Sequence, residues 1–420
     1  MNQISLGGDK ILSYYAKFII ASYVLIGFFE KIHSIVDMIL VLDGLVTFFS
    51  IVFVFLWFFE KRRFPCNEGS VSLLLFSSFI LFSSLVGMSS LDRFSVSGFA
   101  IVETWALVLA MVEIKRDIRD IFLFFSLFAI VFSLIYSIFG LIQGIENEEV
   151  RLSGLSDQSN SLGVMAAMSI ILLMVNIRKW RRIEATVIWN IFDIGLIPFF
   201  LYILWKSDSR TSLFALVVAC FFIVIVSVIF LFKRTSAFWA LIPASLVIIV
   251  ALLFILTGDR SLKSYTLDAF SSGRTVIWRE TFEAMGLEEH VLGFSGNNEK
   301  LMKALQESGA SNVTLVNQGE RHLAHNMFFG VFFEYGIVAA VSFIFGWFWI
   351  MKKGMGYLKK KERWGLREVF ASLSLLTFFF VHSLAESSIF FIGGAEQLVF
   401  ITAIAAIYAV SVAKRNIVNE

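Results

Sequence analysis

Cysteine, proline, histidine and charged residues are all scarce in this sequence. Its 420 residues include two cysteines, three prolines and five histidines, and only 16% of them are charged. The cysteines stand apart, Cys66 beside a basic cluster and Cys220 inside an apolar run, which excludes a disulfide framework and a cysteine-rich metal site. A soluble chain of this length needs a far more polar surface, so the composition excludes an ordinary soluble protein and indicates a lipid environment.

Long apolar runs are what the sequence has instead. Apolar residues make up 58% of the chain, and a helix needs about 20 mostly apolar residues to cross a bilayer. The runs are continuous rather than alternating, which favours helices over the strands of a membrane barrel. We therefore predict an all-α, polytopic integral membrane protein with about 12 transmembrane helices. The predicted spans are residues 11–29, 37–59, 70–88, 95–112, 121–143, 160–177, 186–205, 211–232, 237–257, 326–350, 369–387 and 396–413.

Lysine and arginine concentrate in alternate loops. Most of the 35 basic residues lie in one set, which includes "EKRRFPCNEG", "RKWRR" and "MKKGMGYLKKKERWGLRE". Because cytoplasmic loops carry the excess of basic residues, this set and both termini are predicted to be cytoplasmic. No small-residue cleavage site follows the first run, which predicts a retained first helix. The predicted organisation is transmembrane helices 1 to 9 in residues 1–257, a large periplasmic loop in 258–324, and transmembrane helices 10 to 12 in 325–420.

The loop 258–324 is about as polar as a soluble protein. Its pattern predicts two helices, one over residues 272–287 with Trp278, Phe282 and Met285 on one face, and one over 297–308 that ends before Gly309. The loop has too few apolar residues for a core of its own, so we expect it to form a helical cap over the membrane helices rather than a separate domain.

Several polar residues are out of place on the predicted periplasmic side, where basic residues are otherwise rare. They are Arg151, Lys206, Arg210, Arg274, Arg321, His322, His325, His382 and Glu386. Ionisable groups at membrane depth are costly and usually face a polar cavity or one another. Each has a plainer interpretation, such as snorkelling for Arg210, a hydrogen bond at a helix start for His325, and a structural role for His382. Their grouping on one side of the membrane favours a site.

The residue types indicate the chemistry of that site. Arginine is suited to bidentate binding of phosphate oxygens, so two or three arginines around one cavity predict a diphosphate. Histidine titrates near neutrality and is suited to removing a proton from a hydroxyl. The sequence has no Asp-x-Asp or histidine-rich metal motif, so we expect no metal and no cofactor, with arginines supplying the positive charge. Together these residues predict glycosyl transfer from a lipid diphosphate carrier.

Four stretches resemble, in order, motifs of the bacterial O-antigen ligase and polymerase superfamily, whose integral membrane enzymes join or extend lipid-linked surface polysaccharides. They are "RLSGLSDQSNSLGVMAAM", "SDSRTSLFAL", "SSGRTVIWRETFEA" and "AHNMFFGVFFEYGIVAAV". The last resembles the family's His-Asn, nine residues, Gly element, with His325, Asn326 and Gly336 at the matching positions. The resemblance covers the chain from about residue 145 onward.

This resemblance implies a metal-independent, inverting glycosyltransferase of the bacterial inner membrane, with its active site on the periplasmic side. The donor would be an undecaprenyl-diphosphate-linked oligosaccharide and the acceptor a glycolipid. A chain-length regulator is a candidate partner, and nucleic acid is not. Arg210 and Arg274 would stabilise the departing diphosphate, and His325 would orient or deprotonate the acceptor hydroxyl. The remaining residues expected to bind substrate are Arg151, Arg321, Asn326 and Glu386.

Two departures from the family pattern leave polymerase and ligase both open. Ala339 stands where ligases often have glycine, and the spacings from Arg151 to Gly163 and from Arg274 to Gly286 miss the Arg-x10-Gly pattern of polymerases by one residue. We favour a polymerase, which extends a lipid-linked chain, over a ligase, which transfers the chain to lipid A core. The alternative of another class is a transporter or flippase for lipid-linked sugars, which the asymmetric loop and the one-sided polar residues disfavour.

Overall fold

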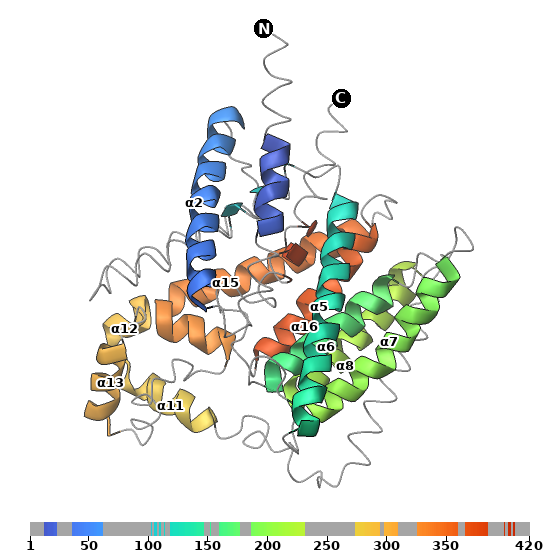
Figure 1. Cartoon of the computed structure of the whole chain (residues 1–420). Helices are drawn as coiled ribbons and strands as arrows, with labels where there is room; N and C mark the ends of the chain where they lie inside the picture. Colours follow the sequence, from blue (N-terminus) through green and yellow to red (C-terminus); the bar gives the residue numbers. More distant parts are fainter. Residues whose placement is uncertain are drawn as a thin grey trace.

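The computed structural model describes the chain in segments, and within them every regular element is helical (Figure 1). The described residues are 12–22, 36–61, 102, 105–106, 109–110, 113, 118–146, 152, 159–176, 186–231, 274–294, 298–309, 326–359, 366–384, 399, 402–404 and 406–407. The helices are α2 (Val36–Lys61), α5 (Ile118–Glu146), α6 (Ser159–Asn176), α7 (Thr186–Lys206), α8 (Arg210–Val226), a π-helical turn (Ser227–Leu231), α11 (Arg274–Ala284), α12 (Leu287–Leu292), α13 (Asn298–Glu307), α15 (Met327–Lys359) and α16 (Leu366–Ser383).

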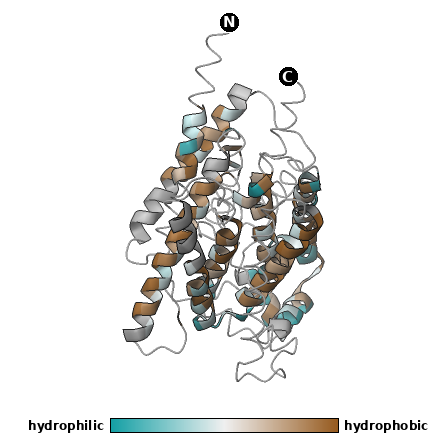
Figure 2. Ribbon diagram, turned by 90° about the vertical axis from the view of Figure 1, so that its right-hand side faces the viewer, coloured by the Kyte–Doolittle hydropathy of each residue, from teal (hydrophilic) through white to brown (hydrophobic). Residues whose placement is uncertain are grey.

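The long helices coincide with predicted apolar runs. Four helical stretches are long and apolar enough to cross a membrane, namely Phe122–Ile142, Arg210–Ile229, Met327–Lys359 and Leu366–Ser383. Shorter apolar stretches lie at Leu45–Trp57, Asn160–Val175 and Gly195–Lys206. Figure 2 shows hydrophobic residues along these helices and hydrophilic ones mainly toward their ends. The predicted spans 70–88 and 237–257 lie outside the described residues, so the count of 12 stays a prediction.

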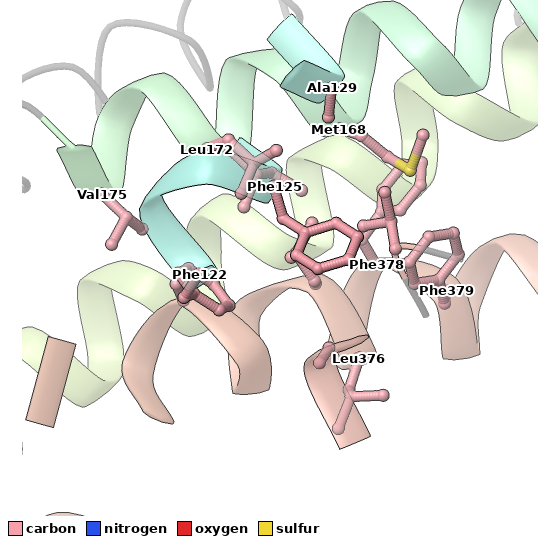
Figure 3. Packing of buried hydrophobic residues seen from close by; sticks show 14 of the residues in the cluster. Phe122, Phe125, Ala129, Met168, Leu172, Val175, Leu376, Phe378 and Phe379 are labelled. Carbon is pink, nitrogen blue, oxygen red and sulfur yellow. The ribbon is translucent and has the colours of Figure 1, made fainter. Parts of the chain in front are cut away.

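Helix α6 is the centre of a helix bundle formed by α5, α6, α7, α8 and α16. It packs against α5, α7, α8 and α16, and its residues 161–175 are buried without a break. Alanine at Ala166 and Ala167 keeps the helix thin enough for this close approach on all sides. Figure 3 shows Phe125 of α5 against Met168 of α6 and Phe378 of α16. These buried contacts fix the positions of the ends of α5, α6 and α16 relative to one another.

Helix α15 is broken at Gly336. This glycine has φ 78° and ψ −178°, far from helical values, and divides α15 into Met327–Tyr335 and Ile337–Lys359. The end of α12 lies in the break, where the backbone N–H of Phe294 donates a 2.7 Å hydrogen bond to the carbonyl of Phe333. A non-helical residue at position 336 removes the helical partner of such a carbonyl, and the loop supplies a replacement.

The contact between α12 and α15 is made by main chain on both sides. A Cβ on Gly336 would overlap the carbonyl of Val291 and lie 2.7 Å from the nitrogen of Leu292. A Cβ on Gly293, which has φ 71°, would overlap the main chain of Glu334 and Tyr335. Glycine is therefore required at both positions for two reasons, the positive φ and the close approach of the two main chains. We refer to Gly293 and Gly336 with these contacts as the glycine lock.

The loop helices share a core with α15 instead of having one of their own. Met285 and Phe294 of the loop are buried with residues of α15, chiefly Val331, Phe332 and Phe333. Trp278 of α11 and Leu301 of α13 pack against the same cluster. The two predicted loop helices are present as α11 and α13, whereas α12 was not predicted. Phe282, predicted on the same face as Trp278 and Met285, is half-exposed, although its ring stacks on that of Phe332 in α15 with the centroids 5.9 Å apart.

Candidate functional site

A tight turn joins α7 to α8 and presents Arg210. The turn consists of Ser207, Asp208 and Ser209, with Asp208 at a positive φ of 53°. Arg210 is the first residue of α8 and its side chain is exposed. The Ser209 hydroxyl donates to the Ser212 hydroxyl at 2.8 Å and makes no capping bond to the first backbone N–H groups of α8. The positive end of the helix dipole and the guanidinium therefore lie together at this turn.

Leu152, which follows α5 in the sequence, is bound next to the same turn. The N–H of Leu152 donates to the carbonyl of Lys206 at 3.2 Å, and the buried Leu152 side chain lies over Gly144 of α5. A Cβ on Gly163 in the first turns of α6 would overlap the side chain of Ser209. Glycine at position 163 thus lets the α7–α8 turn lie directly on α6. Leu152, the described residue of the "RLSG" stretch, thus lies beside the turn that precedes the "SRT" helix start, although the two are far apart in sequence.

Asn326 ties the start of α15 to the end of α16. Its side-chain oxygen accepts hydrogen bonds from the N–H groups of Phe328 and Phe329 at 2.9 and 3.1 Å, which caps α15. Its side-chain nitrogen donates to the carbonyl of Leu384 at 2.6 Å, just beyond α16. The side chain is buried and both ends of its amide are used. Asn326 therefore fixes the backbone next to His325.

The end of α16 and the start of α6 lie at the same end of the helix bundle. In Figure 3, residue numbers rise along α16, from Leu376 to Phe379, toward the side where Met168 lies, and they fall along α6 from Val175 to Met168 in that direction. The two helices are therefore antiparallel. Since α6 begins beside the α7–α8 turn, the end of α16 and the Asn326 cap attached to it point toward the end of the bundle that carries Arg210.

The predicted site residues are placed to different extents. Arg210 and Asn326 are described in full, and Arg274 begins α11 as the first helical residue after the long loop segment, with only its backbone described. His382 is buried in α16 with its ring 5.7 Å from that of Phe378. The Nζ of Lys206, at the end of α7, lies 5.2 Å from the centroid of the Trp205 ring. The remaining predicted residues lie outside the described part of the chain, at positions Arg151, Arg321, His322, His325 and Glu386. Arg151 and His325 are next in sequence to the described residues Leu152 and Asn326. Glu386 is two residues beyond the described Leu384.

Charge in the loop helices is concentrated between α12 and α13. Lys300 forms ion pairs with Glu288 at 3.1 Å and with Glu289 at 2.9 Å. Burial alone would raise the pKa of Glu289, but the hydrogen bond and charge of Lys300 outweigh it and hold that pKa below its usual value. Burial alone would likewise lower the pKa of Lys300, and the two carboxylates raise it. The pairs hold α13 against α12 and, through the glycine lock, against α15.

The structure adds residues that the sequence did not single out. Ser207 and Ser209 contact Gly163, and Gly293 forms the loop's half of the glycine lock. A serine-flanked turn between two apolar helices and a Gly-Phe pair after a short helix are weak signals in a single sequence. Only a positive φ or a close backbone contact distinguishes such glycines from the others.

Residues 195–344 match the family model described as O-antigen ligase. The match begins within α7 and ends within α15, so it includes Arg210, Arg274, His325 and the glycine lock. It does not include Arg151 or Glu386. No curated protein matches the chain.

Proposed function

Because the match over residues 195–344 supports membership of the O-antigen ligase and polymerase superfamily, we propose that this membrane protein is a glycosyltransferase of polysaccharide assembly. It transfers a glycan from an undecaprenyl-diphosphate carrier to a sugar hydroxyl of an acceptor glycolipid, on the periplasmic face of the inner membrane. The observation that supports the proposal is that Leu152 bonds to the end of α7 beside the turn that carries Arg210, while Asn326 joins the start of α15 to the end of α16.

The arginines would bind and stabilise the leaving diphosphate. Arg210 is exposed at the start of α8, where the helix dipole favours an anion, and Arg274 occupies the same position in α11. Guanidinium groups match phosphate oxygens in a bidentate manner. As the glycosidic C–O bond breaks, its electron pair passes to the diphosphate, and the arginine charge offsets the charge that develops there. Arg151, the residue before Leu152 in the sequence, is a third candidate for this role, and Arg321 a fourth.

His325 would act on the acceptor. The acceptor hydroxyl oxygen forms a new bond to the anomeric carbon from the face opposite the diphosphate, which inverts the configuration, and the hydroxyl proton passes to the imidazole of His325. Asn326 supports this step as a positioning residue, because its bonds to the α15 backbone and to Leu384 fix the adjacent peptide. Glu386, two residues beyond Leu384, is the next candidate base. No step of this mechanism requires a metal.

The acceptor decides between polymerase and ligase. We favour polymerization, in which the growing chain passes to the sugar of an incoming lipid-linked repeat unit, because Ala339 departs from the glycine common in ligases. The description of the matching family favours the ligase alternative, in which lipid A core is the acceptor. Purified protein given one donor and each acceptor in turn distinguishes them, since the product is a longer lipid-linked chain in one case and a modified lipid A core in the other.

The test of the proposed chemistry uses His325 in protein reconstituted with a lipid-linked oligosaccharide. His325→Ala should lose about 100-fold or more in turnover, the usual scale for a positioned acid–base group, while donor binding is retained. His322→Ala, three residues earlier, is the control and should be much milder. The wild-type rate should fall as the pH drops through the histidine range. A fully active His325→Asn protein would refute the role of His325 as base, because asparagine keeps a hydrogen bond but cannot accept the proton.

A further inference from the structure

The loop helices expose apolar side chains on one side. Leu287 of α12 is 87% exposed, and Val291, one turn later on the same face, is 44% exposed. Phe282 at the end of α11 is 49% exposed and its ring lies 4.9 Å from that of His290 in α12. The acidic residues of α12 point elsewhere, because Lys300 of α13 holds both Glu288 and Glu289. Helix α12 therefore has an apolar side and a charged side.

The exposed apolar side of α12 lies next to the start of an exposed apolar face on α15. On α15 the exposed large residues recur at helical spacing, at Ile337, Val338, Val341, Phe345 and Phe348. This stripe belongs to a helix apolar enough to cross a membrane, so lipid is its expected neighbour. The stripe begins at the residue after Gly336, and Gly336 is where the main chain of Val291 makes contact. The end of α12 that carries Val291 therefore lies at the start of this stripe, at the glycine lock.

The length of the second part of α15 places the lock at a membrane boundary. Between Gly336 and Lys352, the first lysine of α15, the helix rises about 24 Å, and to Lys359 at its end about 34 Å. The hydrocarbon core is about 30 Å thick, and lysine side chains near its edge extend toward the headgroups. With the lysine end at one surface, the glycine lock lies close to the other. Trp278 and Phe329, whose rings lie 4.9 Å apart, add aromatic residues at this level, where membrane proteins concentrate them.

We propose that α12 lies in the outer surface of the bilayer, with Leu287 and Val291 in contact with lipid acyl chains. The occupant of this apolar surface is the membrane that α15 spans, and the glycine lock sets its depth. An apolar side in lipid with charges on the other side is the arrangement of an interfacial helix. This position of α12 also keeps the neighbouring helix α11, with its first residue Arg274, at the level of the lipid headgroups. On the proposed function, the diphosphate of the lipid carrier lies at that level.

The test is the depth of a fluorescent label. Leu287→Cys and Val291→Cys are made in full-length protein whose native cysteines are replaced, labelled with NBD, and reconstituted in phosphatidylethanolamine and phosphatidylglycerol vesicles with or without dibrominated phosphatidylcholine. Ser308→Cys, exposed at the end of α13, is the control. The labels at 287 and 291 should emit at shorter wavelength than the control and lose intensity in brominated lipid. The label at 308 should be quenched by aqueous iodide instead.

Two outcomes would overturn the proposal. Labels at 287 and 291 that behave like the label at 308 would place α12 in water. Labels that are shielded from iodide but unaffected by brominated lipid would place α12 against protein, such as a second copy of this chain or a regulatory partner. The label reports the position of α12 and not glycan transfer. If the reconstituted protein showed no transfer while the labels were quenched by brominated lipid, the proposed function would be refuted and this inference would stand.

Discussion

Replacing Gly336 by alanine should detach the loop helices from α15. The conformation at Gly336, with φ 78° and ψ −178°, lies in a region that only glycine adopts readily. The added methyl group would also overlap the carbonyl of Val291. Main chain cannot rotate away as a side chain can, so α12 has to move. That movement breaks the 2.7 Å hydrogen bond from Phe294 to Phe333.

The size of the effect follows from these two contributions. The strained backbone costs about 1–3 kcal/mol and the lost hydrogen bond about 1 kcal/mol, which together shift the docking equilibrium by roughly 30- to 1000-fold. Apolar contacts of Met285 and Phe294 add to this total when they are lost. The effect is local, because the core around α6 does not include the lock.

Hydrogen exchange at the Phe294 amide measures docking directly, since that N–H bonds to α15. Exchange should accelerate strongly in Gly336→Ala and in Gly293→Ala. Gly309→Ala is the matched control, because Gly309 also has a positive φ of 73° but has no neighbour within reach of a Cβ. Gly346→Ala, in open space within α15, should be neutral or slightly stabilising. Unchanged exchange in Gly336→Ala, or equal acceleration in Gly309→Ala, would refute the lock.

Three further predictions concern charge and orientation. Arg210→Ala and Arg274→Ala should each abolish transfer without loss of folded protein, and lysine should rescue poorly, since a point charge lacks the bidentate geometry; wild-type activity in both lysine variants would show that charge alone suffices. The pKa of Glu289 is lowered from 4.5, so its ion pair stabilises the α12–α13 contact above that pH and is lost as the pH falls through the lowered value. Hydrogen exchange of the loop amides, corrected for the intrinsic rate, should rise in that pH range. The Glu289→Gln variant should show no such rise. In a cysteine-free background, Ser308→Cys should react with an impermeant thiol reagent in intact spheroplasts and Gly356→Cys should not, and the reverse pattern would contradict the periplasmic placement of the loop.

Apolar runs were sufficient to predict most of the helices. The run 121–143 lies within α5, and the runs 160–177 and 186–205 match α6 and α7 to within one residue at each end. Such runs are long, and little else in this chain competes with them for burial in lipid. The two polar loop helices α11 and α13 were also predicted, because their spacing and end signals are local.

The break in α15 and the pairing of distant segments were not predictable from local pattern. Gly336, Gly346 and Gly354 all lie in one apolar helix, yet only the first leaves helical geometry, because only it meets the main chain of another segment. The motif resemblance marked Gly336 without a physical reason for glycine. The bonds of Asn326 to Leu384 and of Leu152 to Lys206 join residues more than 50 positions apart, which periodicity does not report.

The main-chain character of the lock bears on how such a protein can acquire new substrates. Since backbone atoms make this contact, the exposed side chains of the loop can vary as long as the two glycines and the buried residues Met285 and Phe294 remain. On the proposed function, mutations of these exposed residues that alter which sugars are accepted then need no compensating change in the membrane helices. A lineage under pressure to change its surface polysaccharide can thus revise the loop alone and keep the same scaffold.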